Sequence, residues 1–138
     1  MKLTNEQMIF VNLPVEDLER SKSFYTALGY TLNPTFSNDD GACIVISEHI
    51  FVMVLRKPFF ETFISKPIAD TQATAAVINA LSATSREAVD AQLEKALKAG
   101  GTEPQPPRDY GFMYQRSFQD PDGHLWEVAH MDMDAAPG

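Results

Sequence analysis

An internal repeat constrains the fold of this chain more than any other feature. Two segments, about residues 6–57 and 73–132, each have the predicted order strand, helix and three further strands, and a connector over about residues 58–72 joins them. Each half is too small to bury a sheet face well by itself. We therefore predict one α+β domain in which two βαβββ modules form a curved mixed sheet around a cavity, with the helices outside.

The repeat can be aligned residue by residue at the start of each half. Residues 10–17 align with residues 77–84, and this alignment places Asn12 on Asn79. It predicts that the two asparagines occupy equivalent positions in the two modules.

Capping and turn residues set the limits of the predicted elements. Asp17 and Ser85 are N-cap residues, and Gly29 and Gly100 follow the helices at a position where a positive φ is common. Three- and four-residue spacing predicts packing stripes at Leu18, Ser21, Phe24, Tyr25 and Leu28, and at Ala88, Leu93, Ala96 and Leu97. The predicted strands are residues 8–15, 30–36, 42–47, 50–56, 75–83, 110–119 and 124–131, and residues 102–108 are predicted to be extended.

The composition excludes several classes of function. With 138 residues, 44% of them hydrophobic, the chain can form one globular core. A formal net charge of −8 argues against nucleic acid as a partner, because nucleic-acid binding needs clustered Lys and Arg. No apolar run approaches the roughly 18 residues of a membrane span, and the N-terminus lacks the apolar core of a secretory signal. Cys43, the only cysteine, lies in an apolar run and is expected to be buried, so we predict a cytoplasmic protein.

Two motifs near opposite ends of the chain are similar to those of a known family. Residues 12–29 contain a strand followed by Asp-Leu, Ser, Phe-Tyr and Leu-Gly, and residues 118–127 contain an aromatic residue, Asp-Pro-Asp-Gly and a final Glu. The chain thereby resembles the vicinal oxygen chelate superfamily of glyoxalases, bleomycin resistance proteins and dioxygenases. More narrowly, it is similar to a subgroup of predicted lactoylglutathione-lyase-like proteins. The resemblance covers nearly the whole chain. Because family members commonly form homodimers, it implies a second copy as a candidate partner.

The resemblance also implies a metal site whose ligand positions can be located here. Family members hold a divalent metal between His and Glu side chains, and the metal acts as a Lewis acid on two substrate oxygens. The first ligand position lies seven residues before Asp17 and holds Phe10. The equivalent position in the second half holds Val77, or Ile78 if the alignment shifts by one residue. The last ligand position is Glu127 in the second half, and its counterpart in the first half is Val52 or Met53. Since Glu127 alone retains a ligand type, we expect no metal cofactor of the family kind, with an unconventional divalent-metal site as the alternative.

The histidines do not restore such a site. His49 lies in a turn, His124 at the start of a strand and His130 near the end of the last strand. No two of them have the spacing of a metal-binding motif. We interpret them as surface or strand-end residues.

Strand alternation predicts which side chains face the cavity. In the first half Phe10 and Asn12 face it, and in the second half Val77, Asn79 and Leu81 do so. The two asparagines either contact a ligand or hydrogen-bond to each other or to the backbone.

The last hairpin contains the one retained family residue. A tight turn at residues 120–123 sets Glu127 opposite Ser117, with Gln115 on the same face. A slip of one residue would instead pair Glu127 with Arg116 as a plain ion pair. Glu127 is accordingly either a general acid or base or a structural residue.

These observations support two functions. The first is a protein that binds a small molecule in the sheet cavity without the usual metal, and its predicted contacts are Phe10, Asn12, Asn79, Gln115 and Ser117. The second is a lyase, isomerase or dioxygenase of the superfamily in which Glu127 is catalytic. Whether the chain is an enzyme stays open at this point. A structural or regulatory partner protein is a third interpretation, which the lack of a basic patch or second domain disfavours.

Overall fold

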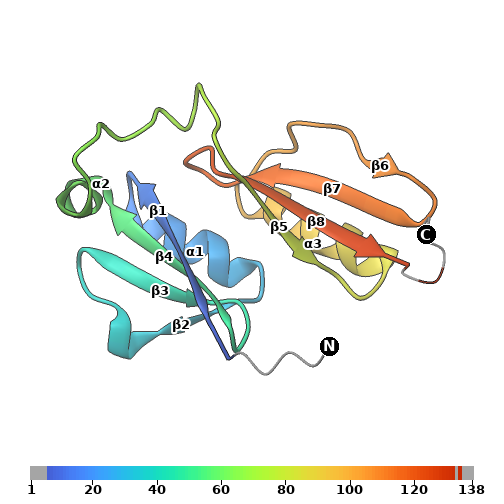
Figure 1. Cartoon of the computed structure of the whole chain (residues 1–138), viewed down its shortest axis with the longest axis horizontal. Coiled ribbons are helices and arrows are strands. Elements are labelled where there is room, and N and C mark those ends of the chain that lie inside the picture. The colour runs from blue at the N-terminus through green and yellow to red at the C-terminus, as the bar shows by residue number, and fades with distance from the viewer. Residues whose placement is uncertain (1–5, 133, 135–138) are drawn as a thin grey trace. The chain divides into compact units, whose positions relative to one another are not determined.

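The structure is a computed structural model that describes residues 6–132 and residue 134. Contacts divide the chain into two compact units that meet between Ile68 and Ala69. Each unit contains one four-stranded mixed sheet and has the order βαβββ (Figure 1). The predicted α+β class and the two βαβββ modules are therefore confirmed. Among the described residues, none of the helices has the length and apolar character needed to cross a membrane.

The first unit follows the predicted order, with one change. Its elements are β1 (Ile9–Val15), α1 (Leu18–Ala27), β2 (Thr31–Asn33), β3 (Gly41–Val45), β4 (Ile50–Arg56) and α2 (Lys57–Phe60). The sheet order is β1-β4-β3-β2, in which β1 and β4 are parallel. The strand predicted over residues 30–36 is too long. Pro34–Phe36 forms a 3-10 turn because the Asn33 side chain accepts a hydrogen bond from the Thr35 N–H.

The second unit repeats this topology. Its elements are β5 (Ile78–Ser82), α3 (Arg86–Lys98), β6 (Arg108–Asp109), β7 (Met113–Gln119) and β8 (Leu125–Met131). The sheet order is β5-β8-β7-β6, in which β5 and β8 are parallel. The first strand is shorter than the predicted range 75–83, and Thr102 forms an isolated antiparallel bridge with Gln119.

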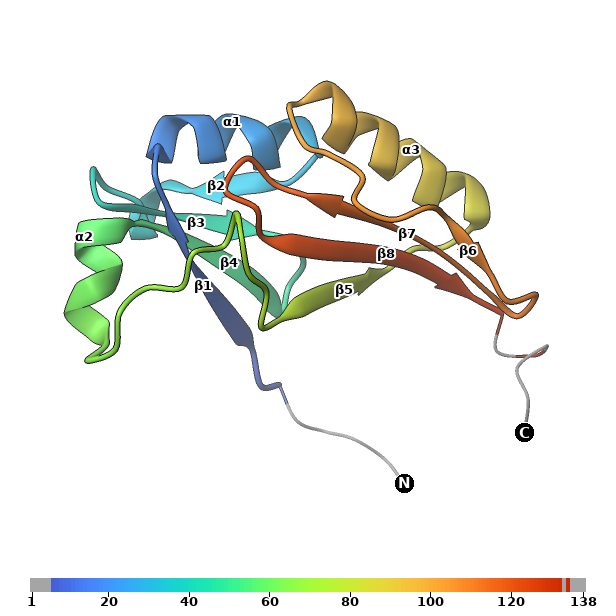
Figure 2. The same ribbon diagram turned by 90° about the horizontal axis from the view of Figure 1, so that it is seen from above.

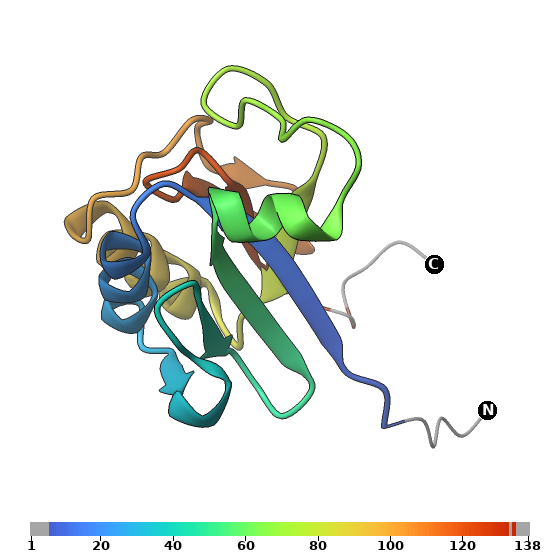
Figure 3. The same ribbon diagram turned by 90° about the vertical axis from the view of Figure 1, so that its left-hand side faces the viewer.

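In the first unit, α1 packs on one face of the sheet. Figure 3 shows this helix beside the strands, with α2 following directly at the end of β4. All five predicted stripe residues of α1 are buried. They meet the strand residues whose side chains alternate toward the helix, which include Val15, Ile44, Val52 and Val54. Burial of these side chains accounts for most of the stability of the unit, at about 1.5–3 kcal/mol each.

In the second unit, α3 lies along β7 and β8 (Figure 2). Its buried residues are Val89, Leu93 and Ala96. The prediction was wrong for Leu97, which is 38% exposed, and it missed Val89. Under the helix, Phe118 and Trp126 are Cα partners whose rings stack with their centroids 6.3 Å apart. We call this side of the second sheet the helix face and the opposite side the open face.

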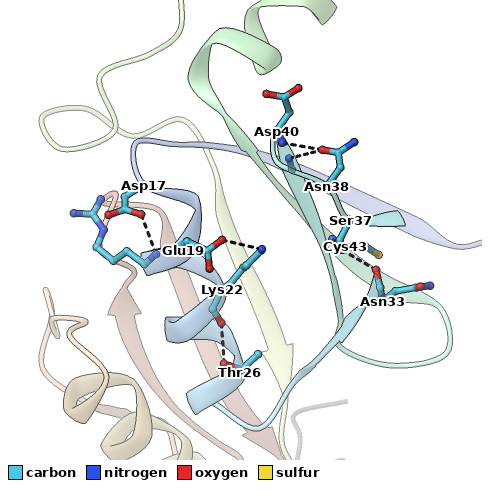
Figure 4. A network of polar contacts seen from close by, with 11 residues as sticks. Asp17, Glu19, Lys22, Thr26, Asn33, Ser37, Asn38, Asp40 and Cys43 are labelled. Carbon is cyan, nitrogen blue, oxygen red and sulfur yellow. Dashed lines mark hydrogen bonds and ion pairs between the residues drawn. The ribbon is translucent and has the colours of Figure 1, made fainter. Parts of the chain in front are cut away.

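Short polar contacts position the ends of the elements in the first unit (Figure 4). The Asp17 carboxylate caps α1 by accepting a hydrogen bond from the Arg20 N–H at 3.1 Å. Near β3, the Ser37 hydroxyl accepts a hydrogen bond from the Cys43 N–H at 3.1 Å. Cys43 is 1% exposed, and burial raises the pKa of its thiol. The prediction that Cys43 is buried is therefore confirmed.

The structure shifts the register of the internal repeat by one residue. Asp17 caps α1 and Ser85 caps α3, and the residues seven positions before them are Phe10 and Ile78. The alignment of Phe10 with Val77 was therefore wrong by one residue, and Ile78, the predicted alternative, is the counterpart of Phe10.

The same shift removes the equivalence of Asn12 with Asn79. The counterpart of Asn12 is Ala80, and Asn79 is the Cα partner of Trp126. Asn79 therefore lies on the helix face, so the prediction that it faces the cavity was wrong.

A buried turn joins β7 and β8. The Asp120 carboxylate accepts hydrogen bonds from the N–H groups of Asp122 at 3.0 Å and His124 at 2.9 Å. Gly123 has a φ of 86° and donates its N–H to the Asp120 carbonyl. These bonds satisfy the buried backbone and hold the hairpin in one register.

The segment before β5 packs on this turn. The Thr71 hydroxyl donates to the Asp122 carbonyl at 2.6 Å, and the Gln72 side-chain amide donates to the Pro121 carbonyl at 2.9 Å. A Cβ atom on Gly123 would lie 2.2 Å from the Thr71 carbonyl oxygen. The turn and the preceding segment thus fit closely only because residue 123 is glycine.

A network of charged and polar groups on the helix face holds β7 to its neighbours. Arg116 forms two bonds of 2.9 Å with Glu103 and one of 3.0 Å with Asp90 on α3. The Tyr114 hydroxyl donates to Asp90 at 2.6 Å. These two donors, Tyr114 first, hold the pKa of the Asp90 carboxyl below its usual range.

A second ion pair fixes β6. Arg86 forms two hydrogen bonds with Asp109, of 2.7 and 2.9 Å, and its guanidinium lies 5.1 Å from the centre of the Tyr114 ring. The Arg86 fork and the Gly111 N–H lower the pKa of Asp109 to about 2. The network as a whole positions the segment that leads from α3 to β7.

We predict that Gly123→Ala destabilises the second unit more than Gly100→Ala does. Both glycines have a positive φ, which costs an alanine about 1–2 kcal/mol, but nothing lies within 4 Å of a Cβ at Gly100. The clash at Gly123 adds about 1–3 kcal/mol. Urea unfolding measures the free energy of unfolding of both variants. Equal losses of this free energy in Gly123→Ala and Gly100→Ala would contradict the close fit of residue 123 to Thr71.

We also predict an acid-dependent contribution from Asp109. Because its pKa is lowered in the folded chain, it stabilises the fold above its ordinary value of about 3.9. That stabilisation is lost as the pH falls from about 4 to about 2. Urea unfolding between pH 2 and 6 should show that the free energy of unfolding depends less on pH in Asp109→Asn than in the parent chain. Adding Arg86→Met to Asp109→Asn should not change this pH dependence further. An unchanged pH dependence in Asp109→Asn would contradict the role of this pair.

Candidate functional site on the open face of the second sheet

Alternation along β7 and β8 brings a set of side chains to the open face. Ser117 is the Cα partner of Glu127, and Gln119 is the Cα partner of Leu125. Gln115 lies two residues before Ser117 on the same face. The predicted hairpin register is therefore confirmed, and the slipped alternative that pairs Glu127 with Arg116 is wrong.

A pocket of about 430 Å³ lies over these side chains. Its walls include Ile78 of β5 and the segment between α3 and β6 with Pro104 and Pro106. Arg108 of β6 also lines it. The volume falls within the range of about 300–1,000 Å³ that is common for small-molecule sites, and the lining combines apolar walls with a few polar groups.

Glu127 is the anionic group of this pocket. Its carboxylate accepts one long hydrogen bond, of 3.4 Å, from the Gln115 side-chain amide. Within residues 6–132, no Lys or Arg forms an ion pair with it. Glu127 therefore retains acceptor capacity toward a ligand.

Ser117 contributes a hydroxyl group to the open-face side chains of β7 and β8. Its hydroxyl oxygen is buried and has no hydrogen-bond partner among the described residues. A buried polar atom without a partner costs about 1–3 kcal/mol. Such an atom beside a pocket is a site where a ligand with a matching polar group gains binding energy.

Arg108 supplies the positive charge. It pairs through its backbone with Gln115, which places it on the open face. In the described part of the chain, no carboxylate lies within ion-pair distance of its guanidinium. The other two arginines of the unit, Arg86 and Arg116, are both held by carboxylates.

The contacts on the helix face also shape the pocket wall. Glu103, which Arg116 holds through two hydrogen bonds, directly precedes Pro104. Pro106 and Pro107 restrict the backbone further toward Arg108. An ion pair on one side of the sheet thus fixes the segment that forms the wall on the other side.

The structure places three of the predicted site residues together within the second unit. Gln115, Ser117 and Glu127 lie together in the second unit. Phe10 and Asn12 lie on β1 in the first unit. The rings of Phe10 and Phe51 stack with their centroids 4.8 Å apart. The Asn12 side-chain amide donates to the Phe10 carbonyl at 3.1 Å, so Asn12 bonds to the backbone of its own strand.

The predictions for β5 were wrong. Val77 lies before the strand and is 63% exposed, and Leu81 is the Cα partner of the buried Val128. Ile78 lines the pocket in their place. Ile78 was the alternative to Val77 in the sequence analysis, and the equal spacing from Phe10 to Asp17 and from Ile78 to the second N-cap favours it.

The family's metal positions can now be placed in each unit separately. Phe10 pairs with Phe51 and Asn12 with Met53, so Met53 is the counterpart of Glu127 in the first unit. The four positions therefore hold Phe10, Met53, Ile78 and Glu127. A divalent metal needs several nitrogen or oxygen ligands, and three of these side chains offer none that suits Zn²⁺, Mn²⁺ or Fe²⁺. The residues present do not fit the family's metal, and no cluster of three His, Cys, Asp or Glu occurs in the described part of the chain.

The three histidines lie apart from the pocket lining. His49 is exposed, as predicted, whereas His124 is 8% exposed and thus not a surface residue. The ring of His130 lies 3.1 Å from the Ala83 carbonyl oxygen, a contact that connects β8 to the end of β5.

Comparison with protein families gives two matches. A model described as bleomycin resistance protein-like N-terminal matches residues 7–47. A model of the Glyoxalase/Bleomycin resistance protein/Dioxygenase superfamily matches residues 61–128. No curated protein matches the chain.

Solved structures share the fold over nearly the whole chain. A hypothetical protein from S. aureus is 28% identical, with a TM-score of 0.78 and coverage of 90% of this chain and 93% of that chain. A glyoxalase/bleomycin resistance protein/dioxygenase family enzyme from Burkholderia phytofirmans is 16% identical, with a TM-score of 0.76 and coverage of 91% and 98%. A fosfomycin resistance protein from Listeria monocytogenes is 21% identical, with a TM-score of 0.65 and coverage of 89% of both chains. The two family matches and the shared fold agree, and the chain is similar to proteins of the glyoxalase/bleomycin resistance protein/dioxygenase superfamily.

Proposed function

We propose that this protein binds a small organic molecule in the open-face pocket of its second unit, without the metal that its family commonly uses. The observation that carries the proposal is the buried hydroxyl of Ser117, which lacks a partner among the described residues. Ser117 lines the pocket and is the Cα partner of Glu127.

The apolar walls supply binding energy. Ile78, Pro104, Pro106 and Leu125 surround the polar row of the pocket. Burying apolar ligand surface against them contributes about 25 cal/mol per Å² before the costs of association. The polar groups then orient the ligand rather than provide most of the affinity.

Binding without a metal follows from the ligand positions. Phe10, Met53 and Ile78 replace groups that would coordinate a cation, so the Glu127 carboxyl group is available for a direct contact with the ligand. Some structures with this fold are named as fosfomycin or bleomycin resistance proteins. Those names are consistent with small-molecule binding as a use of the fold, but fold alone does not assign a ligand.

Chemistry at Glu127 is the second candidate function, with a lyase, isomerase or dioxygenase reaction of the kind suggested by the lactoylglutathione-lyase-like resemblance. It is favoured by the single long hydrogen bond to the carboxylate, which leaves an oxygen free to take a proton from a bound molecule. A saturable activity that Glu127→Gln abolishes, with unchanged ligand binding, would establish it.

We predict that Leu125→Trp blocks ligand binding. The larger side chain occupies the pocket, whereas Leu97→Trp adds the same group to an exposed position on α3. A fragment library screened by ligand-observed NMR should give hits with the parent chain and with Leu97→Trp. The same hits should disappear with Leu125→Trp, and circular dichroism should show that both variants are folded. Hits that persist in Leu125→Trp would place binding elsewhere.

We further predict that Ser117→Ala does not destabilise the protein in the absence of ligand. Removing an unpartnered buried hydroxyl should leave the unfolding free energy unchanged or raise it by up to about 1 kcal/mol. The control is Ser85→Ala, which removes the cap bond to the Ala88 N–H and should cost about 1 kcal/mol. Urea unfolding compares the two, and a loss in Ser117→Ala as large as that in Ser85→Ala would show that Ser117 has a structural role.

A further inference from the structure

We infer that the ligand of the open-face pocket is a hydroxy-substituted oxyanion, a small molecule with an apolar body, one carboxylate-like group and one hydroxyl group. This inference rests on the proposed function and names the chemistry of its ligand. It follows from three groups on one face of the sheet, namely Arg108, Ser117 and Glu127.

The hydroxyl group of the ligand is indicated by the pairing of Ser117 with Glu127. These residues are Cα partners across β7 and β8, yet the Ser117 hydroxyl is not hydrogen-bonded to the carboxylate or to any other described group. A hydroxyl placed between them accepts a hydrogen bond from Ser117 and donates one to Glu127. An ammonium group could donate to both oxygens, but it would leave the Ser117 hydroxyl proton without an acceptor.

The oxyanion is indicated by Arg108. Its guanidinium has five donors and forms no ion pair with a described carboxylate, although Arg86 and Arg116 each do. A planar carboxylate or a phosphate-like group matches this donor geometry. The negative net charge of the chain does not oppose such a contact strongly, because distant surface charges are screened beyond about 8 Å at physiological salt.

The spacing of these groups limits the size of the ligand. Arg108 pairs with Gln115, two residues from Ser117, and Glu127 lies one strand further on. Two strand spacings and two residue steps separate the Cα atoms of Arg108 and Glu127 by about 12 Å. The anionic group bound by Arg108 and the hydroxyl group bound by Ser117 and Glu127 therefore lie at most about 12 Å apart on one carbon skeleton. The apolar body of the ligand lies against Ile78 and Leu125.

Matched sets of probes test this inference. Each set has a hydroxy acid, the acid without the hydroxyl, the amide of the hydroxy acid, and the amino acid of the same skeleton. Mandelate, phenylacetate, mandelamide and phenylglycine form one set, and cyclohexyl and isobutyl skeletons form two more. Dissociation constants are measured by amide chemical-shift titration on the ¹⁵N-labelled full chain, with Gln115 and Leu125 reporting from the pocket.

We expect the hydroxy acid to bind at least about fivefold more tightly than the other three members of at least one set. Ser117→Ala should remove the difference between hydroxy acid and deoxy acid, and Arg108→Gln should remove the difference between acid and amide. Lys98→Gln removes the same charge at the end of α3 and should change neither difference.

Two outcomes would overturn the inference while leaving the proposed function intact. One is equal or tighter binding of the deoxy acid, amide or amino acid in every set. The other is binding of neutral or cationic library fragments at Gln115 and Leu125 while no hydroxy acid binds. If no fragment or probe shifts these two amides, both the inference and the proposed function fail.

Discussion

The register of the β7–β8 hairpin decides what the open face of the second sheet presents. Asp120 accepts two backbone hydrogen bonds within the turn, and Gly123 takes up the positive φ that the turn needs. This arrangement pairs Ser117 with Glu127 and places Phe118 and Trp126 under α3. A shift of one residue would bury Glu127 beneath the helix and bring Trp126 to the pocket, because side chains alternate between the two faces. Both the core and the candidate site thus depend on one turn.

The two faces of this sheet are also coupled through charge. Arg116 bonds to Asp90 on α3 and to Glu103 at the base of the pocket wall, and Arg86 holds Asp109 beside Arg108. These ion pairs position the backbone segments that carry them. They add little net stability, because removing charged groups from water offsets much of the gain from pairing them. Arg108 is the arginine of this unit that forms no ion pair with a described residue, and it faces the pocket.

Much of the fold was predictable because its signals are local. Asp17 and Ser85 cap the helices, and the Asp-Pro-Asp-Gly turn at residues 120–123 predicted the pairing of Glu127 with Ser117. The prediction for Asn79 failed because the chance match of two asparagines outweighed the spacing to the N-cap, and an error of one residue reverses the face of a strand. The roles of Arg108 and the Pro104 segment were not predictable, since they depend on contacts between segments far apart in the sequence.

The metal content of the purified protein is the measurement that tests whether Glu127 acts in its pocket without the family's metal. Elemental analysis would be performed after incubation with Zn²⁺, Ni²⁺, Mn²⁺ or Fe²⁺ and exhaustive dialysis, for the parent chain and for Glu127→Ala. The account predicts no metal above background in either protein, because Phe10, Met53 and Ile78 occupy three of the four ligand positions. A near-stoichiometric metal that is lost in Glu127→Ala would contradict it and would restore metal-assisted chemistry at this site.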